Sequence, residues 1–276
     1  MKTHHLLKGL KVLYLAFHFV LMVFPLYWIV ITSLKPQKDI FSMPIRYWPE
    51  TISFENYANI FKVSKFHVYI GNSLLIAILA AIIVIAIAIL GGYVMARFKF
   101  RGQKQIMIAF FVTQMLPGFV ALAPLYLFMS KLDLINNRMS LLIMYTVMQI
   151  PFSTIMLRGF FQRIPNSLEE AAMIDGCSRL SALARVIIPV MLPGIASTFI
   201  FCFVQNWNEL FMAVLFIDEE SLKTLPVAMN SFVMKFNIDW GSMSAGTVLS
   251  VLPTVILFGF AQRFIVEGLT QGAEKG

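Results

Sequence analysis

Residues 165–189, PNSLEEAAMIDGCSRLSALARVIIP, form a polar interruption in a chain that is otherwise largely apolar. Ser167 is a residue type that caps helix N-termini, and Glu170 stands three residues later, as in a capping box. Asp175 and Gly176 predict the end of this helix, because glycine adopts the left-handed backbone conformation at little cost. The stretch therefore predicts two short helices joined at Gly176.

The second of these helices has one apolar face. Ser178 can cap its start, and apolar residues then recur with helical spacing at Leu180, Leu183, Ala184, Ile187 and Ile188. Arg179 and Arg185 lie off this face. A capped pair of helices with basic side chains, placed between hydrophobic segments, favours a surface that a second protein binds.

Composition places the chain in a broad class. Hydrophobic residues make up 59% of the 276 residues and charged residues only 13%, whereas an ordinary soluble domain carries about 25% charged residues. We therefore expect an all-α polytopic membrane protein. The net charge of +8 is compatible with nucleic-acid binding, but the positive-inside rule already places basic residues beside membrane spans. Cys177 and Cys202 offer no disulfide framework, so both are expected to be free thiols.

Six runs without charged residues have about the 20 residues that a spanning helix needs. They cover residues 12–34, 68–96, 105–130, 139–157, 186–208 and 240–262, and the fifth run continues past Glu209 to about Ile217. An even number of spans places both termini on one side. The first run is long enough to span and no small-residue cleavage site follows it, so no cleavable signal peptide is expected.

Basic residues predict which side is cytoplasmic. Of the 22 Lys and Arg residues, 13 lie in the N-terminal segment, the turn after the second run, the 165–189 stretch with its approach, and the C-terminal segment. The tightest cluster extends from Arg97 to Lys104. The positive-inside rule therefore predicts cytoplasmic termini and a cytoplasmic 165–189 stretch.

Prolines interrupt the third and the fourth predicted spans, among others. Pro117 and Pro124 lie in the third, and Pro151 lies in the fourth. Membrane helices tolerate such breaks where neighbouring helices or a water-filled cavity satisfy the freed backbone groups. The prolines indicate either a bundle with a path through it or kinked helices that only pack together.

The fifth run carries an unusual polar set that includes Asn206, Asn208 and Glu209, and Glu209 is the one acid embedded in a hydrophobic run. Ionisable groups at membrane depth usually face a bundle interior or a cavity. This favours the lining or gate of a pathway, to which Gln114 can also contribute. The alternatives are a hydrogen-bonded contact between helices and a position near the outer interface.

Motifs for independent chemistry are absent from the sequence. There is no GxxxxGK[ST] phosphate-binding loop, no HExxH, no GxSxG and no CxxC, so neither an enzyme nor an ATPase nor a metal site is predicted. The apolar runs also lack the row of embedded acids or histidines that would indicate an ion-coupled pump. A transporter of this kind takes its energy from a partner, and the 165–189 stretch is the predicted place to receive it.

The same stretch resembles a known family. Glu170-Ala171-Ala172, three residues, Gly176, nine residues and Val186-x-Ile188-Pro189 resemble the EAA loop of binding-protein-dependent ABC importer permeases, with Val186 in place of Ile and Ile188 in place of Leu. Ser33-Leu34-Lys35, Asn56-Tyr57, Trp207-Asn208-Glu209 and the tail from Gly268 resemble the carbohydrate branch of the maltose-transporter MalG type. In that tail, Gln271 and Glu274 replace the usual Ala and Val.

The resemblance implies an organisation and a set of sites. Residues 1–70 would hold the first of six transmembrane helices and an external surface segment, 71–263 the ABC type I permease module with its cytoplasmic EAA loop at 165–189, and 264–276 a cytoplasmic tail. The residues implied in coupling to the ATPase are Glu169, Glu170, Ala171, Ala172, Asp175, Gly176 and Pro189. The implied tail contacts with the ATPase are Gly268, Leu269, Thr270, Gln271 and Gly272.

The resemblance also implies partners: a second, MalF-type permease subunit, two cytoplasmic ABC ATPase subunits that bind ATP and Mg, and an external solute-binding protein. The chain itself would need no cofactor. It would form half of the translocation pathway of a di- or oligosaccharide importer in a bacterial inner or plasma membrane. Two alternatives stay open: an ABC permease for another solute, and an ion-coupled secondary carrier.

Overall fold

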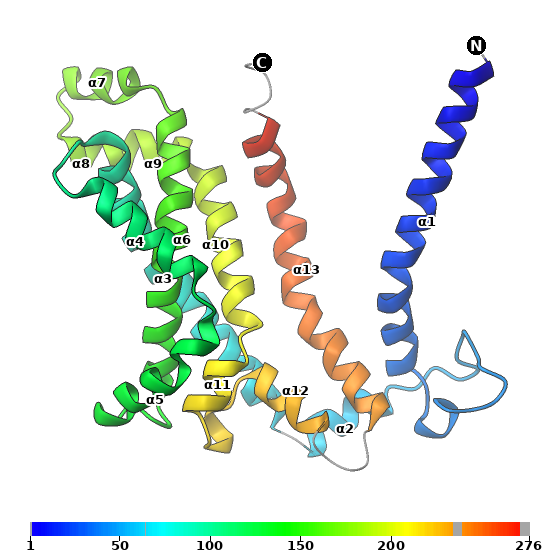
Figure 1. Ribbon diagram of the computed structural model, residues 1–276. Coiled ribbons are helices and arrows are strands. Elements are labelled where there is room, and N and C mark those ends of the chain that lie inside the picture. Colours follow the sequence, from blue (N-terminus) through cyan, green and yellow to red (C-terminus); the bar gives the residue numbers. More distant parts are fainter. Residues whose placement is uncertain (1, 64, 234–238, 271–276) are drawn as a thin grey trace. The chain divides into compact units, whose positions relative to one another are not determined.

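The computed structural model describes residues 2–63, 65–233 and 239–270, and all regular secondary structure in these ranges is helical (Figure 1). This confirms the predicted all-α class. The chain divides into two compact units, of which one comprises Met1–His67 and Ala228–Pro253 and the other Val68–Val227 and Thr254–Gly276. Each unit is described by itself.

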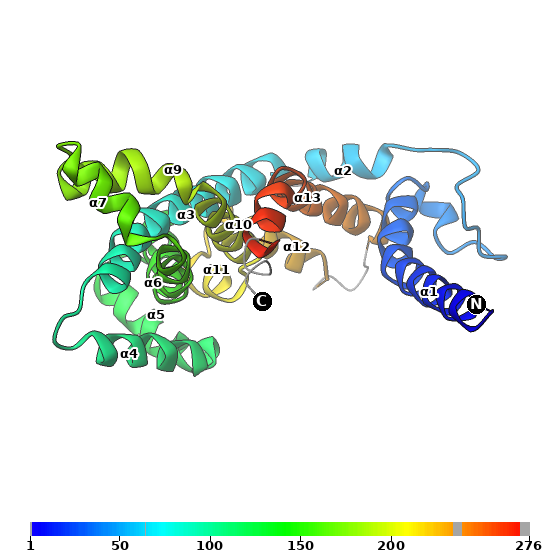
Figure 2. The same cartoon turned by 90° about the horizontal axis from the view of Figure 1, so that it is seen from above.

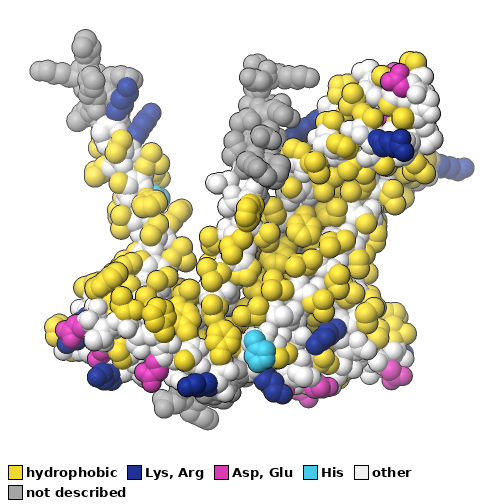
Figure 3. Space-filling view, turned by 180° about the vertical axis from the view of Figure 1, so that it is seen from behind, with side chains coloured by type: hydrophobic (Ala, Val, Ile, Leu, Met, Phe, Trp, Pro, Cys, Tyr) yellow, Lys and Arg dark blue, Asp and Glu magenta, His cyan; other side chains and the backbone are white. Residues whose placement is uncertain are grey.

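Four helices in the described ranges are long and apolar enough to cross a membrane: Lys8–Ser33 of α1 (Lys2–Ser33), α3 (Phe66–Arg97), α6 (Arg138–Arg163) and Trp240–Phe260 of α13 (Trp240–Thr270). A fifth span arises if Arg179–Val190 and Leu192–Trp207, bent by 77° at a short break, count as one. Figure 3 shows hydrophobic side chains along the helices and charged side chains near their ends. The protein is therefore a multi-pass membrane protein.

The predicted span over residues 105–130 is not one continuous helix. Two shorter helices, α4 (Gln103–Met115) and α5 (Leu122–Lys131), flank the turn η2 (Gly118–Ala121). Leu116 is extended, at φ −77° and ψ 127°, because a residue before proline disfavours the helical conformation. Neither piece reaches the length of a span, so the described helices do not confirm the predicted six spans.

In the unit that contains α1, the segment after this helix is hydrogen-bonded to the helix end. It includes η1 (Gln37–Asp39) and α2 (Glu55–Val63). The Asn56 amide donates to the carbonyl oxygens of Ser33 (2.9 Å) and Lys35 (2.8 Å), and the Ser33 and Tyr57 hydroxyls lie 2.8 Å apart. The segment after α1 is therefore ordered by contacts with the helix end.

Lys35 lies at the centre of these contacts and is only 2% exposed. Its ammonium donates to the carbonyl oxygen of Arg46 (2.6 Å) and lies 5.0 Å from the centre of the Trp28 ring. Burial lowers the pKa of Lys35 below its usual range, because a charged amine loses hydration there. Gly241 at the start of α13 packs against the same segment, since a Cβ there would lie 2.7 Å from Cγ of Asn56.

In the other unit, α3 contributes to two buried apolar clusters. Ile76 and Ala80 pack with residues of α5, α6 and α11 (Phe211–Phe216), and Ile85 and Ala88 pack with residues of α6 and the 165–189 stretch. A Cβ on Gly92 would lie 3.0 Å from the backbone nitrogen of Arg158, so the backbones of α3 and α6 approach closely. By contrast, α4 lies at the edge of this unit (Figure 2), and none of its residues is buried.

Candidate coupling site

The first helix of the 165–189 stretch is α7 (Asn166–Ile174), and it ends as the sequence predicts. Gly176 has a φ of +89°, the left-handed conformation that favours glycine. The Asp175 and Cys177 N–H groups donate to the carbonyl oxygens of Ala171 and Ala172, both at 3.0 Å. These bonds satisfy carbonyl groups that a helix end leaves open, so the two-helix prediction with its joint at Gly176 is confirmed.

The predicted cap at Ser167 is wrong. The helix begins at Asn166, directly after Pro165, which is extended at φ −58° and ψ 138° and gives no side-chain cap. Proline fixes φ and is well suited to the position before a helix. Ser167 therefore lies inside the first turn.

The second half of the stretch begins with α8 (Arg179–Ala182), whose predicted cap is confirmed because the Ser178 hydroxyl accepts from the Ser181 N–H at 3.3 Å. A π-helical turn, η3 (Leu183–Ile187), follows, and α9 (Ile188–Val190) leads to α10 (Leu192–Trp207). Pro189 has no N–H to donate back to the preceding turn, which agrees with a wider turn at this point.

This π-helical turn shifts the apolar face. Leu183 and Ile187 of the predicted apolar face are buried, and Ala182 is buried with them. Leu180, which is 70% exposed, and Ala184, which is also exposed, do not share that buried face. An ideal 3.6-residue period fails here because a π turn holds one residue more than an α turn.

Glu169 turns inward and is buried. It accepts a hydrogen bond from the Tyr93 hydroxyl of α3, and its Oε2 lies 3.3 Å from Nε of Arg97. That nitrogen lacks hydrogen-bond geometry to the carboxylate, so the contact is one between charges. The Arg97 guanidinium also donates to the Asn166 side chain (2.5 Å) and to the carbonyl oxygen of Ile164 (3.0 Å). We call Tyr93, Arg97 and Glu169 the coupling clamp.

The other predicted coupling residues divide between two faces. Ala172 is buried on the inner face of α7, whereas the other predicted residues are exposed: Glu170, Ala171, Asp175, Gly176 and, on α9, Pro189. Sequence reasoning missed the exposure of two large apolar side chains, Ile174 (85%) and Leu180 (70%). Exposed apolar side chains on an otherwise polar stretch are typical of a protein-binding surface, and their position on either side of Gly176 was the available signal.

The predicted tail contacts lie at the end of the chain. Gly268, Leu269 and Thr270 belong to the last turn of α13, and Gln271 and Gly272 lie outside the described residues.

The predicted pathway residues do not form one cluster. Glu209 accepts from the Tyr145 hydroxyl (2.9 Å) and from the N–H groups of Met212 (2.9 Å) and Ala213 (3.2 Å). It thereby caps α11 and ties it to α6. Asn208 is exposed and its amide donates to the Val204 carbonyl oxygen (2.9 Å).

Asn206 differs from both residues. It is 6% exposed on α10, and its Nδ2 has no hydrogen-bond partner in the part of the chain that the structure describes. Gln114 is exposed on α4, and no hydrogen bond joins it to the other three among the described residues. A buried amide that is not hydrogen-bonded is costly, which makes Asn206 the member of this set whose local structure leaves room for a further partner.

Comparisons with known proteins give the family. Residues 88–271 match the family described as "Binding-protein-dependent transport system inner membrane component". The chain is 37% identical to the diacetylchitobiose uptake system permease protein DasC of Streptomyces coelicolor, over 94% of each chain. It is 32% identical to the trehalose/maltose transport system permease protein MalG of Thermococcus litoralis, over 93% of each chain.

A solved structure has the same fold. A chain in the crystal structure of a bacterial ABC transporter involved in the import of the acidic polysaccharide alginate superposes with a TM-score of 0.85, at 21% identity, over 96% of this chain and 98% of that one. Together with the EAA-type stretch over α7–α9, these similarities show that the chain belongs to the permeases of binding-protein-dependent ABC importers, in their carbohydrate branch.

Proposed function

We propose that this chain is one of two permease subunits of an ATP-driven di- or oligosaccharide importer, and that the α7–α9 stretch couples it to the ATPase. The similarity to permeases of a diacetylchitobiose and a trehalose/maltose system supports a carbohydrate as the solute. The observation that carries the coupling role is α7 itself: it exposes Glu170, Ala171 and Ile174 while Glu169 is buried against α3.

This arrangement suits a helix that receives a push. Ala171 and Gly176 have little or no side chain, so a partner backbone can approach closely. Ile174 and Leu180 supply apolar contact area. The buried clamp at Glu169 joins the helix to the membrane-embedded part, so a displacement of α7 is passed on. The ATPase then drives alternating access by binding one state of the permease more favourably than the other.

We further propose three kinds of partner subunit and a bacterial membrane as the location of the chain. A similar second permease would complete the pathway, two ABC ATPase subunits would bind ATP and Mg, and an external solute-binding protein would deliver the sugar. The chain would lie in a bacterial inner or plasma membrane with the termini, the α7–α9 stretch and the tail contacts from Gly268 to Gly272 in the cytoplasm. Gln114, Asn206, Asn208 and Glu209 are proposed near the pathway or its gate.

Gly176→Trp tests the coupling role, with Gly102→Trp as its matched control. Both glycines have a positive φ, +89° and +95°, and a Cβ on either would meet nothing within 4 Å. The two variants therefore carry similar backbone strain at different turns. The chain is co-expressed with its partner permease and ATPase, purified in detergent, and the subunits are counted.

The proposal expects Gly176→Trp to lose the ATPase while it keeps the partner permease, and Gly102→Trp to keep both. ATPase that is retained by Gly176→Trp would contradict the role of α7–α9. A wild-type chain that never holds an ATPase would contradict the importer function and favour the ion-coupled carrier. Stimulation of ATPase activity by a panel of sugars, amino acids and peptides then separates a carbohydrate permease from one for another solute.

A further inference from the structure

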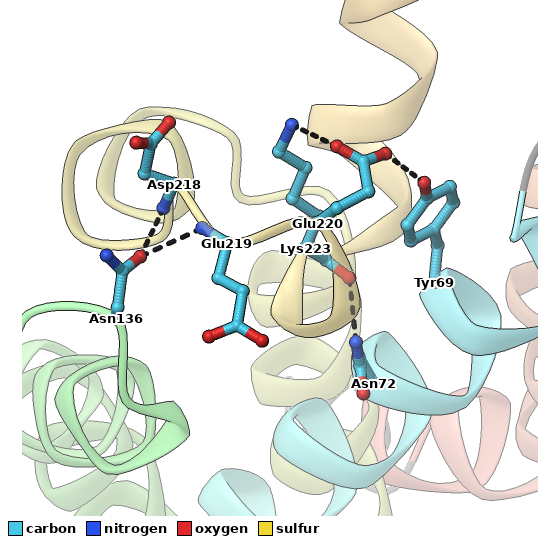
Figure 4. A network of polar contacts seen from close by, with 7 residues as sticks. All are labelled: Tyr69, Asn72, Asn136, Asp218, Glu219, Glu220 and Lys223. Carbon is cyan, nitrogen blue, oxygen red and sulfur yellow. Dashed lines mark hydrogen bonds and ion pairs between the residues drawn. The ribbon is translucent and has the colours of Figure 1, made fainter.

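The loop between α11 and α12 (Leu225–Val233) is held by side chains from the start of α3 (Figure 4). The Asn72 amide donates to the carbonyl oxygens of Ser221 (3.0 Å) and Lys223 (2.9 Å). The Ser73 hydroxyl accepts from the Leu225 N–H (2.8 Å), and the Tyr69 hydroxyl donates to Glu220. We call Tyr69, Asn72 and Ser73 the loop clamp.

The same loop is fixed at its other end by Asn136, which precedes α6. The Asn136 side-chain oxygen accepts from the N–H groups of Asp218 (2.6 Å) and Glu219 (2.9 Å), and its own N–H donates to the Phe216 carbonyl oxygen (2.8 Å). Asn136 has a φ of +57°, a conformation that asparagine tolerates better than most residues. The loop is therefore held at both ends, at one by the loop clamp on α3 and at the other by Asn136.

The two clamps lie at opposite ends of one helix. Asn72 and Tyr93 are 21 residues apart, which corresponds to about 32 Å along an α-helix. The hydrocarbon core of a bilayer is about 30 Å thick. Hence α3 connects the loop clamp on one side of a membrane with the coupling clamp on the other.

This helix is built differently from the other long helices. Prolines lie inside α1, α6 and α13, at Pro25, Pro151 and Pro253, and α3 contains none over its 32 residues. Proline is the commonest cause of a helix kink. A stripe of small buried residues and Gly92 also brings α3 close to its neighbours, so its length is supported along one face.

We propose that α3 is a strut that makes the loop of residues 218–225 move with α7, and that the two clamps are its positioning residues. The inference rests on the proposed function, because it takes α7 as the element that receives the motion of the ATPase. If either clamp is opened, α7 still holds the ATPase, but its displacement no longer reaches the loop. ATP hydrolysis and solute transport should then separate.

The test is the amount of sugar imported per ATP hydrolysed. The complete importer, with its binding protein and a sugar chosen by ATPase stimulation, is reconstituted in liposomes as wild type, Asn72→Leu, Glu169→Gln and the double variant. Asn59→Leu and Glu50→Gln are matched controls: Asn59 is half-buried on α2 and Glu50 has an exposed ion pair with Arg46. Subunit counts show first that each complex is assembled.

We expect either clamp variant to keep its ATPase subunits and to import at least about fivefold less sugar per ATP hydrolysed, the lower end of typical coupling energies. The double variant should lose little more than either single variant, because both interrupt one connection. If Glu169→Gln does not assemble, Tyr93→Phe replaces it, since it removes one hydroxyl from the same clamp.

Three results would overturn the strut. If the clamp variants import as much sugar per ATP hydrolysed as wild type does, the strut is rejected. The importer function then still stands, because wild type transports sugar. Losses that multiply in the double variant would show two separate effects. A wild-type complex that imports no sugar with ATP would remove the proposed function, and the inference with it.

Discussion

The two ends of α3 hold their partners with different chemistry. The coupling clamp contains a carboxylate and a guanidinium that are each 8% exposed, whereas the loop clamp uses an amide and hydroxyls, which mostly bind backbone groups. Removal of one partner from a buried ion pair leaves an uncompensated charge. Removal of a neutral group costs only its hydrogen bonds. The end at α7 should therefore tolerate substitution far less than the end at the loop.

Glu169→Leu has the largest expected effect. We expect the free energy of unfolding in detergent to fall by about 3 kcal/mol, because Arg97 stays buried without its carboxylate. Glu170→Leu is the matched control, since Glu170 is exposed on the same helix, and it should change stability by less than about 0.5 kcal/mol. Equal losses in the two variants would show that the ion pair does not stabilise α7.

Asn72→Leu has the next largest expected effect. It removes two hydrogen bonds to loop carbonyls, at about 1 kcal/mol each, and should lower the free energy of unfolding by about 2 kcal/mol. The change is read from denaturant unfolding in detergent and compared with Asn59→Leu. A loss as large as that of Glu169→Leu would erase the difference between the clamps.

Tyr93→Phe and Tyr69→Phe compare the two clamps directly, because each variant removes one hydroxyl from a different clamp. Both hydroxyls donate to a carboxylate, and Tyr93 meets the buried Glu169 while Glu220 is exposed. A bond to a charged group is worth about 1.5 kcal/mol or more where it is buried, so Tyr93→Phe should destabilise more. Tyr126→Phe is the control, since its hydroxyl has no hydrogen-bond partner among the described residues. A larger loss of stability in Tyr69→Phe than in Tyr93→Phe would contradict this expectation.

The smallest effect is expected for Glu50→Gln. Its ion pair with Arg46, at 2.5 Å, is open to solvent, with side chains that are 37% and 66% exposed. Exposed pairs contribute between zero and about 1 kcal/mol and are screened by salt. Thermal unfolding at low and high salt should therefore differ little between this variant and wild type, and a shift like that of Asn72→Leu would show that exposure is a poor guide here.

Local sequence predicted the features that depend on local chemistry. The glycine at Gly176 ended α7, Ser178 capped α8, and the proline at Pro117 marks the place where the third apolar run divides. The run length alone predicted one helix there, because hydrophobicity does not report a backbone break. The family resemblance, carried by the residues from Glu170 to Pro189, was confirmed by the comparisons.

Features that depend on distant partners were not predictable from the sequence. The inward orientation of Glu169 depends on Tyr93 and Arg97, more than 70 residues earlier in the chain. Glu209 has a hydrogen bond to Tyr145 and caps α11, which the polar pattern around it did not indicate. Leu180 is exposed although its spacing placed it on one face with Ile187, since a fixed period cannot anticipate the extra residue in the π-helical turn η3 between them.

The most direct measurement of the central claim is sugar uptake into liposomes that contain this chain, its partner permease and the ATPase. ATP is supplied at the ATPase side, the binding protein at the other side, and ionophores remove all ion gradients. The importer account predicts uptake that needs both ATP and the binding protein and survives the ionophores. Uptake that continues without the ATPase, or that stops when the gradients are removed, would contradict it.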